Sequence, residues 1–431
     1  MRSKPTPDSA TPRDCAVVAA LSRWFRHAAR DLPWRHAAKG VGGHRDPYWS
    51  LVSEFMLQQT QVSRVLEKFE PFLKRFPTVG ALAAAPEQDV LAAWSGLGYY
   101  RRARLLHACA KAIARDFGGE VPRDVESLQE LPGIGRYTAG AIASIVFNQP
   151  EPIVDGNVCR VLQRLDARPG SASEKDVIAW AWERAESLVK HSSDSPSQRE
   201  GAGGGRRDAS KRVDARQPPV IRKRSHRTST TNPPPTPSLG EGALRHIAND
   251  DDVATPAAFN EGLMELGALV CTPAAPKCLV CPLRDFCLAR EQGRVEEIPA
   301  PKARAKRSRV YHDTVVLWRK TARGVEVLLE QRPATGLWAG LWQPPAIEST
   351  TRKRRTLKSL LAELGLPASA SRTKPREWVF QTTHRDVCFR VWPLQHAHDA
   401  SSPRRWCEEA ELVGIGFSNA HKEVIAIALG R

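Results

Sequence analysis

Hydrophobic residues recur every three to four positions through most of residues 15–190, which is the spacing of an amphipathic helix. Helices are predicted over the ranges that share this spacing: Val17–Ala28, Tyr48–Phe72, Val90–Trp94, Arg102–Phe117, Val125–Leu131, Thr138–Phe147, Gly156–Leu165 and Glu174–Lys190. Prolines stand near expected helix starts, where a missing backbone N–H costs little: Pro47, Pro77, Pro86 and Pro122. Helical spacing resumes at Ala257, so residues 15–290 are predicted to form one mainly α domain.

Beyond residue 310 the hydrophobic positions alternate with polar ones, as in the strands of a sheet. Thr314–Trp318 and Val325–Glu330 are predicted to pair through a turn at Arg323-Gly324. Two more strands and a short helix are predicted at Trp378–Gln381, Val387–Trp392 and Leu357–Leu364. Residues 310–431 are therefore expected to form a separate α+β domain.

Three segments lack a hydrophobic pattern. Residues 1–14 are polar and contain proline, and residues 291–309 read as a basic linker between the domains. Residues 191–252 are rich in Gly, Pro, Ser and Arg and hold few large apolar side chains. Such a composition cannot bury enough surface to order itself, so 1–14 and 191–252 are predicted to be disordered, the latter as an insertion within the helical domain.

The composition of the 431 residues excludes some classes of protein. A hydrophobic content of 41% is typical of globular domains, and no apolar stretch is long enough to cross a bilayer. The N-terminus has no apolar segment of the kind that directs export, so a location in the cytoplasm and nucleoid or in the nucleus is expected. The net charge of +17 favours a polyanionic partner, with nucleic acid first.

Four of the nine cysteines gather in one short segment, at Cys271, Cys278, Cys281 and Cys287. In a chain without an export signal, reduced thiols are the default state. Four thiolates so close in sequence can ligate one metal centre, either zinc or an iron–sulfur cluster. The spacing alone leaves both open.

The stretch from Leu131 to Asp155 carries two features suited to DNA. Gly133 and Gly135 bracket Ile134 between two predicted helices, where glycine permits left-handed backbone and leaves N–H groups free for a phosphate. Asp155 follows at the expected start of the next helix. A plain turn and a simple helix cap explain each feature alone. Their order and spacing together favour a site that holds the DNA backbone and presents a carboxylate.

A second carboxyl group, that of Glu54, lies in an apolar helix segment beside Phe55, Met56 and Leu57. Desolvation raises a carboxyl pKa, so Glu54 could act as a general acid, whereas Asp155 at a helix N-terminus should stay ionised. Cleavage of a glycosidic bond needs such a pair, one group to protonate the leaving group and one to support an oxocarbenium ion. Taken alone, Glu54 could simply extend to solvent.

Seven motifs together resemble the MutY adenine DNA glycosylases, which are helix-hairpin-helix glycosylases with a four-cysteine cluster. They are Leu32–Arg35, Ser53–Gln61, Gly96–Tyr100, the hairpin, Val154–Asn157, Asn260-Glu261 and the four cysteines, in the family's order. The resemblance covers roughly residues 17–190 and 255–290, and more weakly 310–430. It implies a mainly α glycosylase domain of two helical subdomains with a four-cysteine loop, followed by a Nudix-like α+β domain.

The resemblance implies base excision repair in which an adenine opposite 8-oxoguanine or guanine is flipped out of duplex DNA. Glu54 would protonate the adenine ring and Asp155 would stabilise the cationic sugar, with Tyr137 and Asn157 orienting both. Adenine would be held by Trp34, Arg35, Leu57 and Glu261. Near the lesion, Gln58 and Tyr99 would fill the base stack, and Gly133 and Gly135 would clamp a phosphate. Endonuclease III-like relatives form a Schiff base through a lysine where this chain has Tyr137, so a monofunctional enzyme is expected.

The resemblance also implies one [4Fe–4S] cluster per chain, held by the four cysteines, with zinc as the alternative. The cluster loop would carry Lys277 and Arg284 to the DNA backbone. In the Nudix-like domain, Thr383 and His384 would read the lesion, although the family often has Phe-Ser-His where this chain has Thr382-Thr383-His384. The helix expected at Lys358–Leu366 offers only Glu363 for magnesium, so no pyrophosphohydrolase activity is expected.

Two other functions fit part of the sequence. One is a glycosylase with another base preference, and the other is a DNA-binding scaffold without catalysis. The presence of both Glu54 and Asp155 favours an enzyme. We expect duplex DNA as the partner, no membrane and a monomeric chain, and leave open contacts with other repair proteins.

Overall fold

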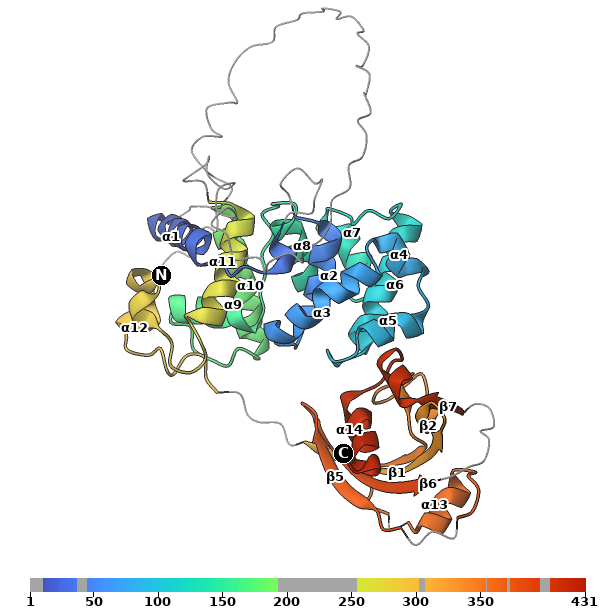
Figure 1. Cartoon of the computed structure of the whole chain (residues 1–431). Coiled ribbons are helices and arrows are strands. Elements are labelled where there is room, and N and C mark those ends of the chain that lie inside the picture. Colours follow the sequence, from blue (N-terminus) through green and yellow to red (C-terminus); the bar gives the residue numbers. More distant parts are fainter. Residues whose placement is uncertain are drawn as a thin grey trace, which may run out of the picture.

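The computed structural model describes residues 11–36, 45–192, 254–301, 307–353, 355–369, 373–395 and 404–431. A helical part and a sheet-containing part follow one another along the chain and lie in contact (Figure 1). Nearly all of the segment predicted to be a disordered insertion, and residues 1–10 of the predicted disordered N-terminus, lie outside the described residues.

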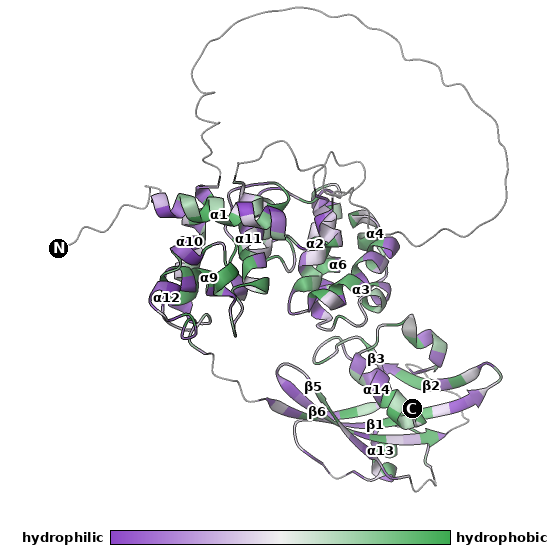
Figure 2. Ribbon diagram, turned by 60° about the vertical axis from the view of Figure 1, so that its left-hand side comes forward, coloured by the Kyte–Doolittle hydropathy of each residue, from purple (hydrophilic) through white to green (hydrophobic). Residues whose placement is uncertain are grey.

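Most helices of the first part lie where they were predicted, whereas two short ones, Val79–Ala84 and Leu288–Glu291, were not predicted. The helices are α1 (Pro12–Ala28), α2 (Pro47–Leu57), α3 (Val62–Arg75), α4 (Val79–Ala84), α5 (Glu87–Ala93), α6 (Arg101–Asp116), α7 (Val125–Glu130), α8 (Arg136–Ile145), α9 (Gly156–Leu165), α10 (Lys175–Lys190), α11 (Pro256–Leu269) and α12 (Leu288–Glu291). Most show hydrophilic and hydrophobic residues together, as amphipathic helices do (Figure 2). The mainly α character predicted for this part is confirmed.

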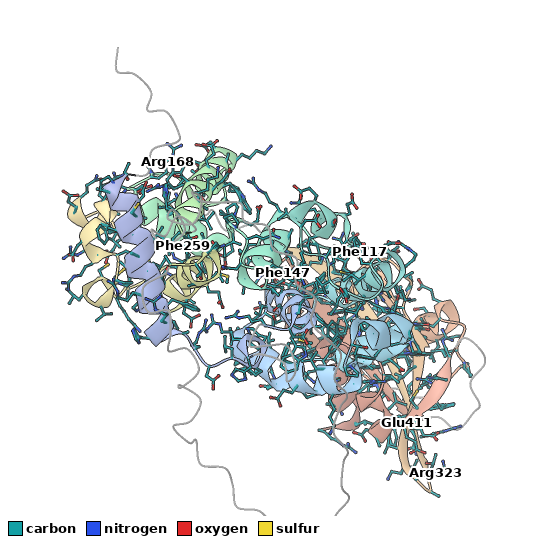
Figure 3. The ribbon with its side chains drawn as sticks, turned by 90° about the horizontal axis from the view of Figure 1, so that it is seen from above. Phe117, Phe147, Arg168, Phe259, Arg323 and Glu411 are labelled. Atoms are coloured by element: carbon teal, nitrogen blue, oxygen red, sulfur yellow. The ribbon has the colours of Figure 1, made fainter. Side chains whose placement is uncertain are left out.

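Two separate hydrophobic cores divide the helical part, as the two predicted subdomains require. One core is built mainly by α2–α6 and includes Phe55, Phe69 and Trp94. The other joins α1, α9, α10 and α11 and includes Leu21, Leu162 and Phe259. The two lie side by side in Figure 3, in which Phe259 marks one and Phe117 the other. Helix α8 contributes to both, through Ile142 and Ala141 respectively.

The structure corrects two predictions for the helical part in particular. The run Tyr48–Phe72 is two helices, α2 and α3, separated at Gln58–Gln61, where Gln59 has a left-handed φ of 55°. The N-terminal segment becomes helical at Pro12 because the Thr11 side chain caps the backbone N–H of Asp14 at 3.2 Å. The buried Asp14 carboxylate in turn pairs with Arg184 at 2.6 Å, which ties this helix start to α10.

The second part is a seven-stranded sheet with the central order β3-β2-β1-β6-β5. Its strands are β1 (Ser308–Thr321), β2 (Gly324–Gln331), β3 (Trp342–Gln343), β4 (Ala346–Ser349), β5 (Arg376–Gln381), β6 (Arg385–Gln395) and β7 (Arg405–Glu408). Strand β1 runs parallel to β6 and antiparallel to β2 and β4. It begins at Ser308, inside the predicted linker, because its first residues pair with β6 from Arg385 onward.

Two helices cover the opposite faces of this sheet. Val316 of β1 packs in the core that includes α14 (Asn419–Leu429), whereas its neighbours Val315 and Leu317 pack in the core that includes α13 (Leu357–Glu363). This alternation is the period of two that predicted strands from the sequence. The α+β class is confirmed, although β3, β4, β7 and α14 were not predicted. No helix in the described ranges is long and apolar enough to cross a membrane.

Helix α8 can approach the segment before α9 only because Gly140 has no side chain. A Cβ atom at Gly140 would lie 2.4 Å from the carbonyl oxygen of Pro152. Gly140→Ala should therefore destabilise the protein by about 1–3 kcal/mol, the usual cost of overpacking, as measured by chemical denaturation. Gly80→Ala in α4 is the matched control, because its Cβ would meet no atom closer than 3.9 Å. Equal stability of the two variants would contradict this account of the packing.

Candidate active site

A cavity of about 670 Å³ lies between the two helical cores. Its walls come from the segment before α2, from α2 and the residues that follow it as far as Val62, and from α8, α9 and α11. The structure brings together there nine of the residues singled out from the sequence: Trp34, Arg35, Glu54, Leu57, Gln58, Tyr137, Asp155, Asn157 and Glu261. Tyr99, Gly133, Gly135, Thr383 and His384 do not line the cavity.

Glu54 projects into this cavity from α2, whose other residues on that turn, Phe55 and Met56, are fully buried. Burial, followed by the negative charges of Asp155 and Glu261, raises the pKa of the Glu54 carboxyl to about 7. The carboxyl is therefore protonated in a large fraction of molecules near neutral pH.

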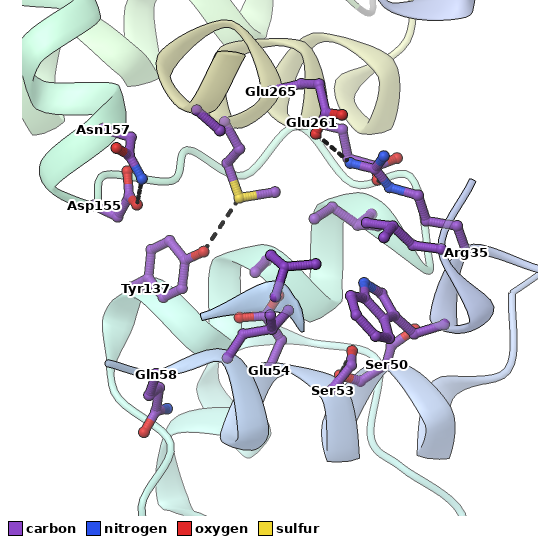
Figure 4. Close-up of a pocket in the computed structure, with 18 of the residues that line it drawn as sticks. Arg35, Ser50, Ser53, Glu54, Gln58, Tyr137, Asp155, Asn157, Glu261 and Glu265 are labelled. Carbon is purple, nitrogen blue, oxygen red and sulfur yellow. Dashed lines mark hydrogen bonds and ion pairs between the residues drawn. The ribbon is translucent and has the colours of Figure 1, made fainter. Parts of the chain in front are cut away.

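Asp155 is both a helix cap and a cavity residue. One oxygen of its carboxylate accepts the backbone N–H of Val158 at 2.7 Å, at the start of α9. The other accepts the side-chain amide of Asn157 at 3.0 Å. The two interpretations of Asp155 that the sequence left open are thus compatible, because the cap fixes the direction in which the carboxylate faces the cavity (Figure 4).

A chain of hydrogen bonds extends from Asp155 to the cysteine loop. The Arg160 guanidinium donates to the side-chain oxygen of Asn157 at 3.0 Å and to the backbone oxygen of Cys271 at 2.8 Å. Helix α11 packs directly on Asn157, since a Cβ on Gly267 would lie 2.8 Å from the Cβ of Asn157. The position of Asn157 is therefore set from two sides.

Tyr137 lies between the two carboxyl groups in Figure 4. Its hydroxyl donates to the sulfur of Met264 at 3.2 Å. Burial, with Glu54 and Asp155 nearby, raises the pKa of Tyr137 well above its ordinary value, so the side chain is a neutral phenol that can donate a hydrogen bond.

Arginines pair with two carboxylates of α11 at the opposite wall. Glu261 accepts from Arg45 at 2.6 and 2.8 Å and from Arg35 at 3.1 Å. Glu265 accepts from Arg30 at 2.7 Å and from Arg35 at 3.0 Å. Arg30, Arg45 and Glu265 were not identified from the sequence. The spacing of Glu261 and Glu265, one turn apart in an apolar helix, is the signal that could have found Glu265.

Of the two glycines in the hairpin between α7 and α8, only Gly133 adopts a left-handed conformation. Gly133 has a φ of 82° and packs against Leu105 and Phe55. Gly135 is extended, with φ −96°, and stands before α8 without a side-chain cap. Because no atom lies within 4 Å of where its Cβ would be, the hairpin surface at Gly135 is open.

The four cysteine thiols line a small separate pocket of about 30 Å³ next to α9. All four thiols are free, and the Arg164 guanidinium lies 3.4 Å from the sulfur of Cys271. Among the described residues, no group of three or more His, Cys, Asp or Glu side chains is arranged to hold a metal ion.

In the sheet domain, acidic groups near α13 are neutralised by arginines. Asp313 accepts from Arg355 at 2.8 Å and from Arg390 at 2.5 Å, and Glu363 accepts from Arg355 at 2.8 Å. Magnesium ligands need free carboxylate oxygens. Glu363 is the acidic residue on which a metal site there would depend, and it is already paired.

A hairpin, two helical cores and a carboxyl pair in the cleft between them are the features of a base excision DNA glycosylase. Residues 52–187 match the HhH-GPD superfamily of base excision DNA repair proteins, and residues 314–426 match the NUDIX domain family. The chain belongs to the adenine DNA glycosylase family, as its similarity to characterised relatives shows.

The adenine DNA glycosylase of Homo sapiens is 31% identical over 478 residues, which cover 97% of this chain and 76% of that protein. The enzyme of Mycobacterium tuberculosis (strain H37Rv) is 33% identical over 363 residues, which cover 83% of this chain and 92% of that protein. The solved structure of a thermostable thymine-DNA glycosylase has 24% identity and a TM-score of 0.44, covering 66% of this chain and 100% of that one.

The raised pKa of Glu54 predicts a pH-dependent cost to stability. In the unfolded chain this carboxyl ionises near its ordinary value of 4.5, whereas in the folded protein it does so near 7. Stability is therefore lost as pH rises from 4.5 to 7, by at most about 3 kcal/mol. Glu54→Gln should be more stable than the parent protein at pH 8 and equal to it near pH 4.5, as measured by denaturant unfolding.

Glu67→Gln is the control for that measurement, because Glu67 is 56% exposed and pairs with Arg64 at the surface. Its stability should follow the parent protein at every pH. If Glu54→Gln does the same, the desolvation argument for Glu54 is wrong.

Proposed function

We propose that this protein is a monofunctional glycosylase that hydrolyses the N-glycosidic bond of adenine paired with 8-oxoguanine, or with guanine, in duplex DNA. Family membership supports action on DNA and on adenine. The observation that carries the mechanism is the presence of Glu54 and Asp155 in one cavity with opposed surroundings. Burial favours the acid form of Glu54, whereas Asp155 is hydrogen-bonded as a carboxylate.

In this mechanism the flipped deoxyadenosine enters the cavity with its base toward Glu54. The Glu54 carboxyl protonates the adenine ring, which allows the bond between base and sugar to break with both electrons leaving on the base. The Asp155 carboxylate stabilises the oxocarbenium ion that forms on the sugar. Water then adds to the sugar, its proton returns to Glu54, and free adenine and an abasic site result.

The remaining cavity residues serve orientation and recognition. Asn157 holds one Asp155 oxygen, and Tyr137 is a neutral phenol that lies between the two carboxyl groups and donates to the Met264 sulfur. A phenol cannot form the imine that strand cleavage by lyase chemistry requires, which supports a monofunctional reaction. Adenine would lie against Trp34 and Leu57, with Arg35 and Glu261 at its polar edge.

The opposite base would be read at the boundary of the two domains. The hydroxyls of Tyr99 and Thr383 form a hydrogen bond across this boundary, and Thr383 and His384 are exposed. Thr382 stands where the family often has phenylalanine, so the ring that could stack there is replaced by a hydroxyl that bonds the backbone of Arg385. Discrimination of 8-oxoguanine would then rest on Tyr99, Thr383 and His384.

Cys271, Cys278, Cys281 and Cys287 would hold a [4Fe–4S] cluster, with zinc as the alternative. This assignment is supported by family membership and by the one pocket that all four cysteines line. The cluster would fix the fold of this loop, whose exposed Lys277 and Arg284 could then contact phosphates.

The function is tested by base excision on a panel of duplexes with adenine opposite 8-oxoguanine, guanine, cytosine or thymine, followed by alkali. Cleavage of the adenine strand after alkali, fastest opposite 8-oxoguanine, is expected. Cleavage without alkali would contradict the monofunctional mechanism. Loss of thymine or another base, with adenine retained, would overturn the substrate assignment.

Asp155→Asn should lower the rate of excision by about a hundredfold or more while DNA affinity stays within about threefold, because the amide oxygen still caps α9 but carries no charge. Single-turnover excision and gel shift measure the two effects. Asp124→Asn is the matched control, since Asp124 caps α7 through Ser127 at 2.8 Å and lies outside the cavity. A parallel loss of affinity in Asp155→Asn would make Asp155 a structural residue only.

The purified protein should contain about four irons and four sulfides per chain and show a broad visible absorption band. Cys278→Ser should reduce the iron content and the melting temperature, while Cys15→Ser, at an exposed thiol of α1, should change neither. A colourless protein that contains one zinc per chain would contradict the cluster and support zinc as the bound metal.

A further inference from the structure

The loop before α6 connects the two domains through two neighbouring tyrosines. The Tyr100 hydroxyl donates to the backbone oxygen of Phe417 in the sheet domain at 2.6 Å, and the Ser95 hydroxyl donates to the same oxygen at 3.3 Å. Tyr100 and Ser95 are both buried, at 6% and 5% exposure. This contact is thus a water-excluded hydrogen bond between domains, of the kind that fixes geometry.

A second set of contacts surrounds this hydrogen bond. Leu341 of the sheet domain is fully buried in the core of the α2–α6 part. Arg104 donates to the backbone oxygen of Ala339 at 2.5 Å, and Gln88 donates to that of Gly340 at 3.3 Å. On the other side, Lys422 of α14 donates to the Ser95 hydroxyl at 3.2 Å. The two domains are therefore docked on each other through packed and hydrogen-bonded side chains.

Tyr99, the residue next to Tyr100, points out of this docked surface. It is 41% exposed and adopts a left-handed φ of 46°, directly after Gly98 with φ 70°. These two left-handed residues turn the chain so that one tyrosine is buried against Phe417 while the other reaches Thr383. The position of Thr383 relative to Tyr99 depends on how the sheet domain is held.

The same loop is tied to the helix that carries Glu54. The buried Arg102 guanidinium lies over the Tyr99 ring, 5.6 Å from its centre. It also donates to the backbone oxygens of Phe55 and Met56 at 2.7 and 2.8 Å. Tyr99 therefore has a fixed support on the helical side, and its counterpart Thr383 needs an equally fixed support on the sheet side.

We propose that Tyr100 is a positioning residue for lesion discrimination. Its hydroxyl anchors the sheet domain at Phe417 so that Thr383 meets Tyr99, and through this geometry it sets the preference for adenine opposite 8-oxoguanine over adenine opposite guanine. Tyr100 lies outside the cavity and touches neither Glu54 nor Asp155, so the bond-breaking step does not depend on it. The inference rests on the proposed function.

Tyr100→Phe removes only the hydroxyl, and Tyr48→Phe is a matched control. Tyr48 is also 6% exposed, and its hydroxyl donates to the backbone oxygen of Phe76 at 2.8 Å, but within the helical part. Single-turnover excision should be measured on duplexes with adenine opposite 8-oxoguanine and opposite guanine. Tyr100→Phe should lower the ratio of the two rates about fivefold, as loss of one hydrogen bond would, and Tyr48→Phe should leave it unchanged.

A double variant, Tyr100→Phe with Thr383→Ala, distinguishes a role of Tyr100 in positioning Thr383 from a general loss of rigidity in the protein. If Tyr100 acts through Thr383, the double variant should show the same rate ratio as Thr383→Ala alone. Full additivity of the two effects would overturn the proposal. An equal fall in both excision rates for Tyr100→Phe, which leaves the ratio intact, would overturn it as well, because the hydroxyl would then serve folding or catalysis.

The parent protein distinguishes a failure of this inference from a failure of the proposed function. If it excises no adenine, or shows no preference for 8-oxoguanine, the proposed function itself is wrong. If it shows the preference and Tyr100→Phe keeps it in full, only the positioning role of Tyr100 is refuted.

Discussion

Two carboxyl groups in one cavity must remain chemically different, and the architecture of the helical part achieves this. Glu54 stands on a helix whose neighbouring residues are buried, so the cost of desolvation keeps its proton bound near neutral pH. Asp155 stands at the start of α9, where the backbone N–H of Val158 and the side-chain amide of Asn157 donate hydrogen bonds to its two oxygens. Because the cavity lies between two cores, the two carboxyl groups stand on different subdomains and have different surroundings.

The elements most accurately predicted from the sequence are those whose start and periodicity agree. Helix α9 was predicted at its observed bounds, because Asp155 is a strong cap and the apolar positions that follow recur without interruption. The run from Tyr48 to Phe72 was wrongly taken as one helix, because helical apolar spacing on both sides outweighed the four polar residues Gln58–Gln61, among which Gln59 is left-handed. Strand β1 was predicted too short, since its first residues are held by pairing with the distant β6 and its last residues by pairing with β2.

The residues of the candidate site could also be predicted where they belong to a local motif, but not where their role depends on the fold. Glu54, Tyr137, Asp155 and Asn157 could be named because they belong to short motifs, and the structure brings them into one cavity. Arg30 and Arg45 could not, because each is one arginine among many, and its meaning appears only when α11 is placed opposite. The contact of Tyr100 with Phe417 joins residues more than three hundred positions apart, so a single sequence holds no sign of it.

The ion pairs of the sheet domain have a consequence of another kind. Arg355 and Arg390 form ion pairs with Asp313, and Arg355 also pairs with Glu363. The positive charges next to these carboxylates are therefore side chains of the protein itself. A fold that needed a divalent ion there would change in stability with the concentration of that ion. In this domain the counter-charges of Asp313 and Glu363 come from arginine side chains, so these ion pairs form within the chain without a divalent ion.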